Sequence, residues 1–427
     1  MSEYAEFLRR KMWATRPSGF EPGAMNARLR PDQRLVTERA LRAGRYAIFA
    51  DCGLGKTLDE LEWGAQVAAR YGPVLILSPL CVALQTQRMA AEFGYEARVC
   101  KSQDDVTDGV NITNYDRLDK FHAGHFAGLI LDESSILKHE SGKTRNALID
   151  AFAQTPYKLA CSATPAPNDF AEIGNHAEFF GVMRRSAMLS MFFVHDGGAT
   201  ADWRLKGHAQ KAFWDWVATW STTYSKPSEL NPAFSDAGFS LPPLHIEKHI
   251  VHCDAQTVGL LFDMPAETLS EQRNVKRRSV GSRVDVAAEI ASGDSPCVAW
   301  CDLNDEADAM ADALDGSEQI CGADSLERKE ELLWAFTTGQ LKKLVTKQKI
   351  TGFGLNWQHC NRTVFVGPNY SYEAAYQAIK RFHRFGQTRP VTAHWVMADL
   401  EYNVFRALMD KMAAHTQMRE ALTCETQ

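Results

Sequence analysis

The chain has 427 residues, of which 45% are hydrophobic, and its formal net charge at pH 7 is −6. A chain of this length can bury two separate cores, so we expect two or three domains. The negative charge excludes a uniformly basic protein that coats nucleic acid, so any contact with nucleic acid requires a local basic groove.

Targeting signals and cysteine usage both indicate a cytoplasmic protein. No stretch approaches the roughly 20 apolar residues of a membrane span, and Met1-Ser2-Glu3-Tyr4 lacks the start of a secretory signal. The ten cysteines include no Cys-x-x-Cys pair, which favours reduced thiols over a disulfide or zinc framework. We therefore expect no contact with a membrane.

Short apolar runs alternate with helical stretches in the first half of the chain. This alternation is typical of a parallel sheet covered by helices on both faces. The expected strands are 46–50, 74–79, 110–113, 129–132 and 159–162.

A phosphate-binding loop follows the first of these strands. The sequence Ala-Asp-Cys-Gly-Leu-Gly-Lys-Thr at 50–57 has Ala50 where the usual pattern has its first glycine, but strand, glycine loop and helix come in the required order. Gly53 and Gly55 would turn backbone N–H groups toward phosphates, Lys56 would reach the β- and γ-phosphates, and Thr57 would hold Mg²⁺. The alternative is a glycine-rich turn with an exposed lysine.

An acidic pair follows the apolar run Gly128-Leu129-Ile130-Leu131. Asp132 and Glu133 therefore emerge at the carboxyl end of a buried strand, where parallel sheets place their ligands. We expect Asp132 to bind Mg²⁺ and Glu133 to act as the base or to orient the attacking water. A solvated acidic turn does not explain why the pair follows four apolar residues.

The region 181–243 has a different composition, in which segments rich in Gly and Pro surround an aromatic segment. Phe213, Trp216 and Trp220 are three and four residues apart, so they form one apolar helical face. We expect this face to pack on a lobe. The alternative, that the region lies beside the path of bound DNA, stays open.

Two clusters of polar residues come next. His245, His249, His252 and Cys253 have a spacing that suits neither a zinc finger nor one helical face, so we do not predict a metal site there. A basic group lies at the start of the second lobe. Two interpretations of it stay open, a solvated helical face and a contact with phosphate. Its members are Arg273, Lys276, Arg277, Arg278 and Arg283.

The last part of the chain repeats the strand pattern and ends in an arginine motif. We expect strands at 296–301, 319–322, 344–346, 363–366 and 391–397. Between Gln377 and Gln387, Arg381 and Arg384 lie three apart, within reach of one helical face. A phosphate-binding loop with arginines more than 300 residues away predicts a two-lobed ATPase whose active site closes between the lobes.

From residue 29 to about residue 401, these motifs resemble those of superfamily 2 helicases, and within them the Swi/Snf-like DNA-dependent ATPases. The resemblance implies two tandem RecA-like P-loop lobes of α/β class. It also implies that Gln33 reads the adenine base, that Arg381 and Arg384 are arginine fingers, and that Gly354 and Gln377 contact the nucleotide. The order of the motifs is that of the family.

The same resemblance implies which residues meet nucleic acid. Asn114 and Tyr115 belong to a first-lobe segment that touches it, and Lys347 and Lys349 to a second-lobe segment that contacts both DNA and nucleotide. Two residues in the Cys161-Ser162-Ala163-Thr164-Pro165 motif, Ser162 and Thr164, would couple hydrolysis to strand movement.

Three departures from the family pattern stand out. Ala50 replaces a glycine of the general P-loop pattern, the acidic motif reads Asp-Glu-Ser-Ser where Asp-Glu-x-His is commoner, and Thr351 stands where most members carry glycine. The short chain and the sequence Asn-Trp-Gln-His-Cys at 356–360 resemble the compact helicases encoded by bacteriophages, which would place the protein in the cytoplasm of a bacterial host.

The expected organisation is an N-terminal segment (1–25), a first RecA-like lobe (26–180), a helical insertion (181–243) and a second lobe (244–427). We expect a monomeric DNA translocase or helicase that uses ATP and Mg²⁺, with duplex DNA favoured and replication or recombination proteins as candidate partners. The alternatives are a strand-separating RNA helicase and a catalytically weak nucleic-acid-binding module. A single-lobe enzyme such as a kinase would leave the arginine motif idle.

Overall fold

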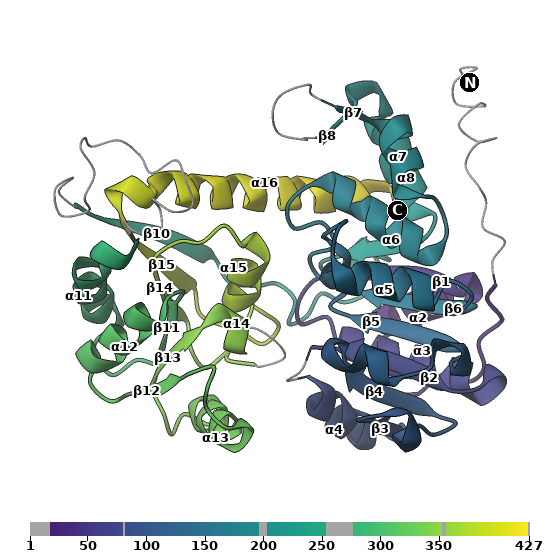
Figure 1. The fold of residues 1–427 in the computed structure, drawn as a ribbon, viewed down its shortest axis with the longest axis horizontal. Coiled ribbons are helices and arrows are strands. Elements are labelled where there is room, and N and C mark those ends of the chain that lie inside the picture. The colour runs from purple at the N-terminus through teal and green to yellow at the C-terminus, as the bar shows by residue number, and fades with distance from the viewer. Residues whose placement is uncertain (1–17, 80–81, 196–202, 253–275, 352–355, 426–427) are drawn as a thin grey trace. The chain divides into compact units, whose positions relative to one another are not determined.

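A computed structural model describes residues 18–79, 82–195, 203–252, 276–351 and 356–425 (Figure 1). The chain divides into two compact units. The first unit contains the chain up to Asp236 together with His415–Gln427, and the second contains Ala237–Ala414. None of the helices in the described ranges combines the length and apolarity that crossing a bilayer requires.

The first unit is built on a seven-stranded sheet with the order β3-β4-β2-β5-β6-β1-β9, in which every pairing is parallel. Its central strands are fully buried, which is why they read as unbroken apolar runs in the sequence. The strands are β1 (Arg45–Ala50), β2 (Val74–Ser78), β3 (Ala97–Val99), β4 (Val110–Asn114), β5 (Gly128–Asp132), β6 (Tyr157–Cys161) and β9 (Ser221–Tyr224).

Helices pack on both faces of this sheet. On one face, Phe49, Leu77 and Leu131 belong to a core formed with α5 (Lys143–Ala151), α6 (Ile173–Phe180), α7 (Arg185–Phe192) and α8 (Gln210–Ala218). The opposite face contacts α2 (Pro31–Ala43) and α3 (Lys56–Tyr71), and α4 (Ala83–Phe93) packs beside α3. Gly64 lets α3 approach closely, because a Cβ there would meet Ile130 and Val110 at 3.3 Å.

The aromatic segment packs on the first unit, as expected. Phe213, Trp216 and Trp220 are buried in the same core as Phe49 and Phe180. The strand β9 directly after them pairs with β1 and completes the first sheet. Before them, β7 (Phe193–His195) and β8 (Trp203–Leu205) form an antiparallel pair.

The second unit contains a six-stranded parallel sheet with the order β10-β15-β14-β11-β13-β12. On one face, Ala299, Val364 and Val396 pack with α11 and α12. On the other, Trp300, Phe365 and Trp395 pack with α13, α15 and the start of α16, and the rings of Phe365 and Trp395 stack at 4.0 Å.

The strands of this sheet are β10 (Leu244–Val251), β11 (Cys297–Cys301), β12 (Ser317–Ile320), β13 (Lys343–Lys347), β14 (Arg362–Val366) and β15 (Val391–Ala398). The helices are α11 (Val280–Ala291), α12 (Asn304–Ala313), α13 (Leu326–Thr337), α14 (Gln348–Thr351), α15 (Tyr372–Ile379) and α16 (Tyr402–Glu425). Two parallel sheets, each covered by helices, confirm the predicted tandem RecA-like architecture, and all ten predicted strands are present.

The domain boundaries differ from the expected ones in two places. The segment 181–243 is not a separate insertion throughout, because β9 lies at the edge of the first sheet and α8 in its core. The last helix begins in the second unit, but its residues from His415 onward belong to the first. Met418 is buried in the core of the first unit. The expected second lobe of residues 244–427 does not account for this position.

Two members of the basic group at the start of the second unit are buried. Arg283 has no exposed surface, and it pairs with Glu306 at 2.8 Å and Glu401 at 3.5 Å. Lys276 pairs with Asp302 at 2.9 Å. A phosphate contact is therefore the wrong interpretation for Arg283, because the charge neutralises carboxylates inside the second unit. Arg277 and Arg278 are exposed, and Arg273 lies outside the described residues.

Replacing Arg283 by Met should destabilise the second unit strongly. The substitution leaves Glu306 and Glu401 buried without their guanidinium partner, and breaking a buried pair in this way costs about 3 to 5 kcal/mol. Hydrogen exchange of the β11 and β14 amides measures this loss within the second unit. Arg277→Met is the matched control because Arg277 is exposed, and equal protection in the two variants would contradict a structural role for Arg283.

Candidate active site

The loop between β1 and α3 has the geometry of a phosphate cradle. Gly53 and Gly55 have φ angles of 90° and 80°, a region that favours glycine. A Cβ on Gly55 would also meet the Nε2 of Gln33 at 2.6 Å. The helix α3 begins at Lys56 directly after the loop, so its positive end faces the cradle. The predicted order of strand, loop and helix is confirmed.

Lys56 is surrounded by acidic groups. Its Nζ donates hydrogen bonds to the carbonyl oxygens of Ala50 at 3.0 Å and Asp51 at 3.3 Å. Burial lowers the pKa of Lys56, but Cys52, Glu133 and Asp51 outweigh that effect, so the pKa is raised overall. The ammonium group is therefore charged at neutral pH. Thr57 follows it in the first turn of α3 and is partly buried.

Two buried carboxyl groups lie side by side next to this lysine. Burial raises the pKa of Asp132, at the end of β5, to about 6, although Lys56 opposes the shift. Burial and the neighbouring Asp132 raise the pKa of Glu60, one turn along α3 from Lys56. Sequence reasoning missed Glu60, although its i, i+4 spacing from Lys56 places the two residues on one face of the helix.

Glu133 has a strained backbone. Its φ of 54° makes it the one non-glycine residue with positive φ in the ranges that the structure describes. Left-handed backbone at a non-glycine residue costs of order 1 to 3 kcal/mol and is found mostly at functional sites. Asp132 is the last residue of β5 and Glu133 lies in the turn that follows, which suits different roles for the two carboxylates.

One of the two expected coupling residues, Ser162, contacts this carboxylate, and the other, Thr164, contacts Ser162. The hydroxyl of Ser162 donates to the Oε2 of Glu133 at 3.4 Å, and the backbone N–H of Thr164 donates to the Oγ of Ser162 at 3.0 Å. The loop after β6 is thereby connected to the acidic motif. Movement of either one changes the hydrogen bonding of the other.

The acidic motif also has a histidine partner that sequence reasoning missed. The Oγ of Ser134 lies 3.0 Å from the Nε2 of His176, a buried residue of α6. Burial lowers the pKa of His176 to about 4, so its ring is neutral at physiological pH. A histidine of α6 therefore contacts the third residue of the Asp-Glu-Ser-Ser sequence.

Gln33 lies against the phosphate-binding loop. Its Nε2 donates to the carbonyl oxygen of Gly55 at 3.1 Å, and its Oε1 accepts from the backbone N–H of Arg30 at 3.2 Å. Arg30, which sequence reasoning did not single out, donates to the carbonyl oxygen of Leu54 at 2.7 Å. These contacts place Gln33 at the nucleotide site, while reading of adenine stays a prediction.

The first-lobe residues expected to meet nucleic acid lie at the end of β4. The hydroxyl of Tyr115 donates to the backbone carbonyl of Asp132 at 2.7 Å, so it ties this segment to the acidic motif. The Oδ1 of Asn114 is buried and accepts no hydrogen bond from the described residues. Contact with nucleic acid stays a prediction for both residues.

The C-terminal helix supplies a further contact that sequence reasoning missed. Arg419 pairs with Asp51 of the phosphate-binding loop at 3.0 Å and also hydrogen bonds to Ser225 after β9. A ring nitrogen of His415 lies 3.1 Å from the carbonyl oxygen of Ala163. No local signal identifies this contact, because 368 residues separate Arg419 from Asp51.

In the second unit, the expected lysines lie at the carboxyl end of β13. The Nζ of Lys347 donates to Asn304 at 2.6 Å. Burial raises the pKa of Asp302, but Lys276, Lys349 and Lys347 outweigh that effect and lower it overall. The lysines therefore form one basic group around Asp302, while contact with DNA stays a prediction. Gly354 lies outside the described residues.

The arginine motif is not helical, in contrast to the expectation. The helix α15 contains Gln377 but ends at Ile379, and Arg381 and Arg384 lie in the turns that follow. The Nε2 of Gln387 donates to the carbonyl oxygens of Gln358, Cys360 and Phe382. These bonds, with the buried ring of Phe382, stabilise a compact turn. Arg381 is buried and Arg384 is partly buried.

The first-unit site fits a nucleotide with Mg²⁺. Both carboxyl oxygens of Glu60 are buried, with Asp132 and Cys161 as hydrogen-bonding neighbours and no N–H partner among the described residues. Asp132 and Glu60 thus offer hard oxygen ligands beside Lys56, and oxygen is the ligand type that Mg²⁺ prefers. The glycine cradle and the N-terminus of α3 suit the phosphates.

Comparisons with known proteins find a similarity in structure alone. No protein-family model matches it, and no curated protein matches it. Among solved structures it is similar to the Sulfolobus solfataricus SWI2/SNF2 ATPase core in complex with dsDNA, with 17% sequence identity and a TM-score of 0.44. The match covers 95% of this chain and 96% of that chain. The fold assignment therefore rests on the two parallel sheets themselves.

Asp132→Asn should stabilise the first unit in the absence of nucleotide and Mg²⁺. A carboxyl group whose pKa is raised by folding opposes folding once it ionises, so the gain should grow between about pH 4 and pH 6 and stay constant above. We expect about 1 to 3 kcal/mol at pH 8. Hydrogen exchange of the β1 and β5 amides, measured in EDTA across this pH range, reports the change.

The exposed residue Asp116 provides the control for this prediction. Asp116→Asn should leave the exchange of the same amides unchanged at every pH. A gain for Asp132→Asn that is equally large at pH 4.5 and pH 8 would contradict the electrostatic explanation.

Proposed function

We propose that the protein is an ATP-dependent DNA translocase or helicase whose ATP hydrolysis is stimulated by DNA. The observation that carries the proposal is the group around Lys56, in which a glycine cradle, buried carboxyl groups and the Glu133–Ser162 contact meet at one sheet edge. These are the parts that phosphoryl transfer to water requires.

Each first-unit residue has a distinct role in this proposal. Lys56 and the N–H groups of the loop bind the β- and γ-phosphates, and Thr57 and Asp132 hold Mg²⁺. When bound, Mg²⁺ neutralises charge on the β- and γ-phosphate oxygens. Glu133 accepts a proton from, or orients, the attacking water. Ser162 keeps the Glu133 carboxylate in place through its hydroxyl.

Glu60 adds a proton store beside the Mg²⁺ ligand. Because the pKa values of Glu60 and Asp132 are both raised by burial, the pair retains a proton at a pH where isolated carboxyl groups are ionised. Binding of a cation by Asp132 would therefore compete with this proton.

Residues of the second unit complete the proposed reaction. Arg381 and Arg384 approach the γ-phosphate when the lobes close, and Gln377 and Gly354 support the nucleotide. Finger arginines raise turnover by about 10³- to 10⁵-fold, so hydrolysis depends on closure. Nucleic acid that binds across both lobes favours the closed state and thereby stimulates turnover.

The proposed DNA contacts come from both units. Asn114 and Tyr115 serve in the first, and Lys347 and Lys349 in the second. Lys347 and Lys349, which both lie near Asp302, support a backbone contact, since lysines bind phosphates without reading sequence. The resemblance of the motifs to the Swi/Snf-like group favours movement along duplex DNA.

ATP turnover should be stimulated by duplex DNA more than by single-stranded DNA or RNA. The test measures phosphate release by the full chain with each nucleic acid and with none. Stimulation by RNA alone would replace the proposal with an RNA helicase. The absence of turnover under every condition would leave a nucleic-acid-binding module of the same fold.

Two first-unit variants should separate nucleotide binding from hydrolysis. Lys56→Ala should abolish turnover because the ammonium that offsets phosphate charge is lost. Glu133→Gln keeps the shape of the side chain but removes the base, so nucleotide should still bind while turnover collapses. Binding of a fluorescent ATP analogue is measured alongside turnover. Normal turnover by folded Lys56→Ala protein would remove the P-loop assignment.

Arg384→Ala and Arg381→Ala should lower DNA-stimulated turnover by at least about a hundredfold, or roughly 2.7 kcal/mol of transition-state stabilisation. ATP affinity should change by a small factor, since most nucleotide contacts are proposed for the first unit. Arg384 is the cleaner position because it is only partly buried.

The second-unit lysines provide the contrast for the arginine variants. Lys347→Ala and Lys349→Ala should weaken DNA binding and flatten its salt dependence. If the arginine variants instead lose DNA binding and hydrolyse ATP normally, the arginines contact the DNA backbone and are not fingers.

A further inference from the structure

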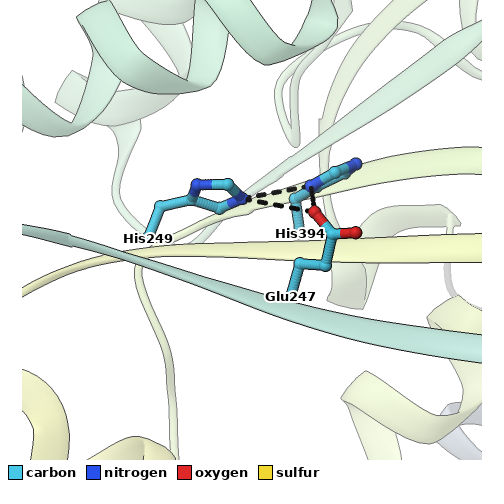
Figure 2. A group of neighbouring side chains, drawn as sticks. All are labelled: Glu247, His249 and His394. Carbon is cyan, nitrogen blue, oxygen red and sulfur yellow. Dashed lines mark hydrogen bonds and ion pairs between the residues drawn. The ribbon is translucent and has the colours of Figure 1, made fainter.

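Three possible metal ligands converge on the sheet of the second unit. Figure 2 shows Glu247, His249 and His394 with their polar atoms directed at one another. The Nε2 of His249 lies 3.1 Å from the Nδ1 of His394, which lies 3.2 Å from the Oε2 of Glu247. The third distance, from the Nε2 of His249 to the Oε2 of Glu247, is 4.0 Å.

The sheet register explains why these residues meet. The strands β10 and β15 are parallel, and Glu247 lies directly opposite His394. His249 follows Glu247 by two residues, so both side chains project from the same face of β10. This is the face on which Val251 and Val396 pack with α11. The ligands therefore come from two rigid strands, 145 residues apart in the chain.

The distances suit one bound transition-metal ion. Zinc bonds to histidine nitrogen and carboxylate oxygen are about 2.0 to 2.2 Å long, so tetrahedral ligand atoms lie roughly 3.3 to 3.6 Å apart. The three measured distances, from 3.1 to 4.0 Å, bracket this range. Imidazole nitrogen also selects transition metals over Mg²⁺ and Ca²⁺, which prefer all-oxygen sites.

The group can be a hydrogen-bonded cluster or a set of ligands, depending on the histidine tautomers. In the tautomers that leave both facing nitrogens unprotonated, these nitrogens and the carboxylate oxygen direct lone pairs at one point, which a cation there would satisfy. The exposed fraction of the side chain is 13% for His394, 31% for His249 and 54% for Glu247. The two strands therefore position the three side chains, and the exposed side of the group is open to solvent for a fourth ligand.

We propose that Glu247, His249 and His394 form a mononuclear site for a divalent transition-metal ion, with Zn²⁺ the best fit and water as the fourth ligand. The ion clamps β10, the edge strand of the second sheet, onto β15. Because β10 is the first strand of the second unit, the clamp stabilises the entry of the chain into this sheet. The site is independent of the nucleotide site.

The histidine cluster considered from the sequence is different from this group. His245 is exposed on β10, His252 pairs with Asp399 at 3.2 Å, and Cys253 lies outside the described residues. Only His249 of that cluster contributes a ligand. Its partners are Glu247, which carries no metal signal alone, and His394, which the sequence places far away.

The test is a titration of the metal-free full chain with Zn²⁺, followed by calorimetry, and with Co²⁺, followed by its visible absorption. We expect about one Zn²⁺ bound per chain with submillimolar or tighter affinity, and a Co²⁺ spectrum typical of tetrahedral nitrogen and oxygen ligation. Loss of an outer partner alone costs about 10- to 100-fold in metal affinity, so His249→Gln should weaken binding by at least about a hundredfold.

Matched controls separate this site from binding elsewhere. His252→Gln removes a neighbouring histidine that also faces a carboxylate, and it should leave the titration unchanged. Zn²⁺ should also slow hydrogen exchange of the β10 amides in the wild type and in His252→Gln, but not in His249→Gln. Glutamine retains a hydrogen-bonding group beside His394, so the variant should fold.

Two results would overturn the proposal. In the first, His249→Gln and the wild type bind Zn²⁺ with equal affinity, which assigns the ion to cysteines or other histidines. In the second, Zn²⁺ leaves the exchange of β10 unchanged at saturation, which removes the clamp. ATP turnover is not a readout, so failure here leaves the proposed function untouched.

Discussion

Parallel pairing of β1, β5 and β6 is the constraint on which the first-unit site depends. The register sets Ile48 opposite Cys161 and Asp132 opposite Cys161 on the other side. The carboxyl ends of all three strands consequently lie at one edge of the sheet. The loop after β1, the acidic pair after β5 and the Ser162 loop after β6 therefore meet without any long side chain having to reach across.

This convergence has an energetic cost that the rest of the unit has to offset. Asp132 and Glu60 are buried next to each other, and Glu133 has a left-handed backbone. Burying like charges together and straining one residue both oppose folding. The apolar core of the unit, which joins the sheet to α5, α6, α7 and α8, is the main source of stabilisation against this cost. Functional sites commonly contain residues whose arrangement lowers the stability of the fold.

The second unit uses buried polar groups for a structural purpose. Arg283 connects α11 to Glu306 of α12 and to Glu401 before α16, so a single guanidinium joins three segments. The proposed metal clamp acts at the edge of the same sheet, where β10 has one neighbour, β15, among the strands that the structure describes. Both features place charge where apolar packing alone does not specify which segments lie side by side.

The sequence by itself determined ten of the strands, the strand–loop–helix order around Lys56, and the position of Asp132 and Glu133. These features are local, since buried parallel strands are short apolar runs and a phosphate cradle needs glycines next to a helix start. Glu60 was also within reach of sequence reasoning through its spacing from Lys56. The role of each site residue in hydrolysis stays a prediction.

Only the tertiary structure decided the features that depend on distant contacts. Arg419 reaches Asp51, His176 reaches Ser134, and β9 completes the first sheet, although nothing near them in the sequence indicates these partners. The turn that carries Arg381 and Arg384 was expected to be helical because their spacing fits a helix, but hydrogen bonds from Gln387 stabilise a different backbone. Spacing reports which residues share a face of one element, whereas burial and pairing depend on which elements pack together.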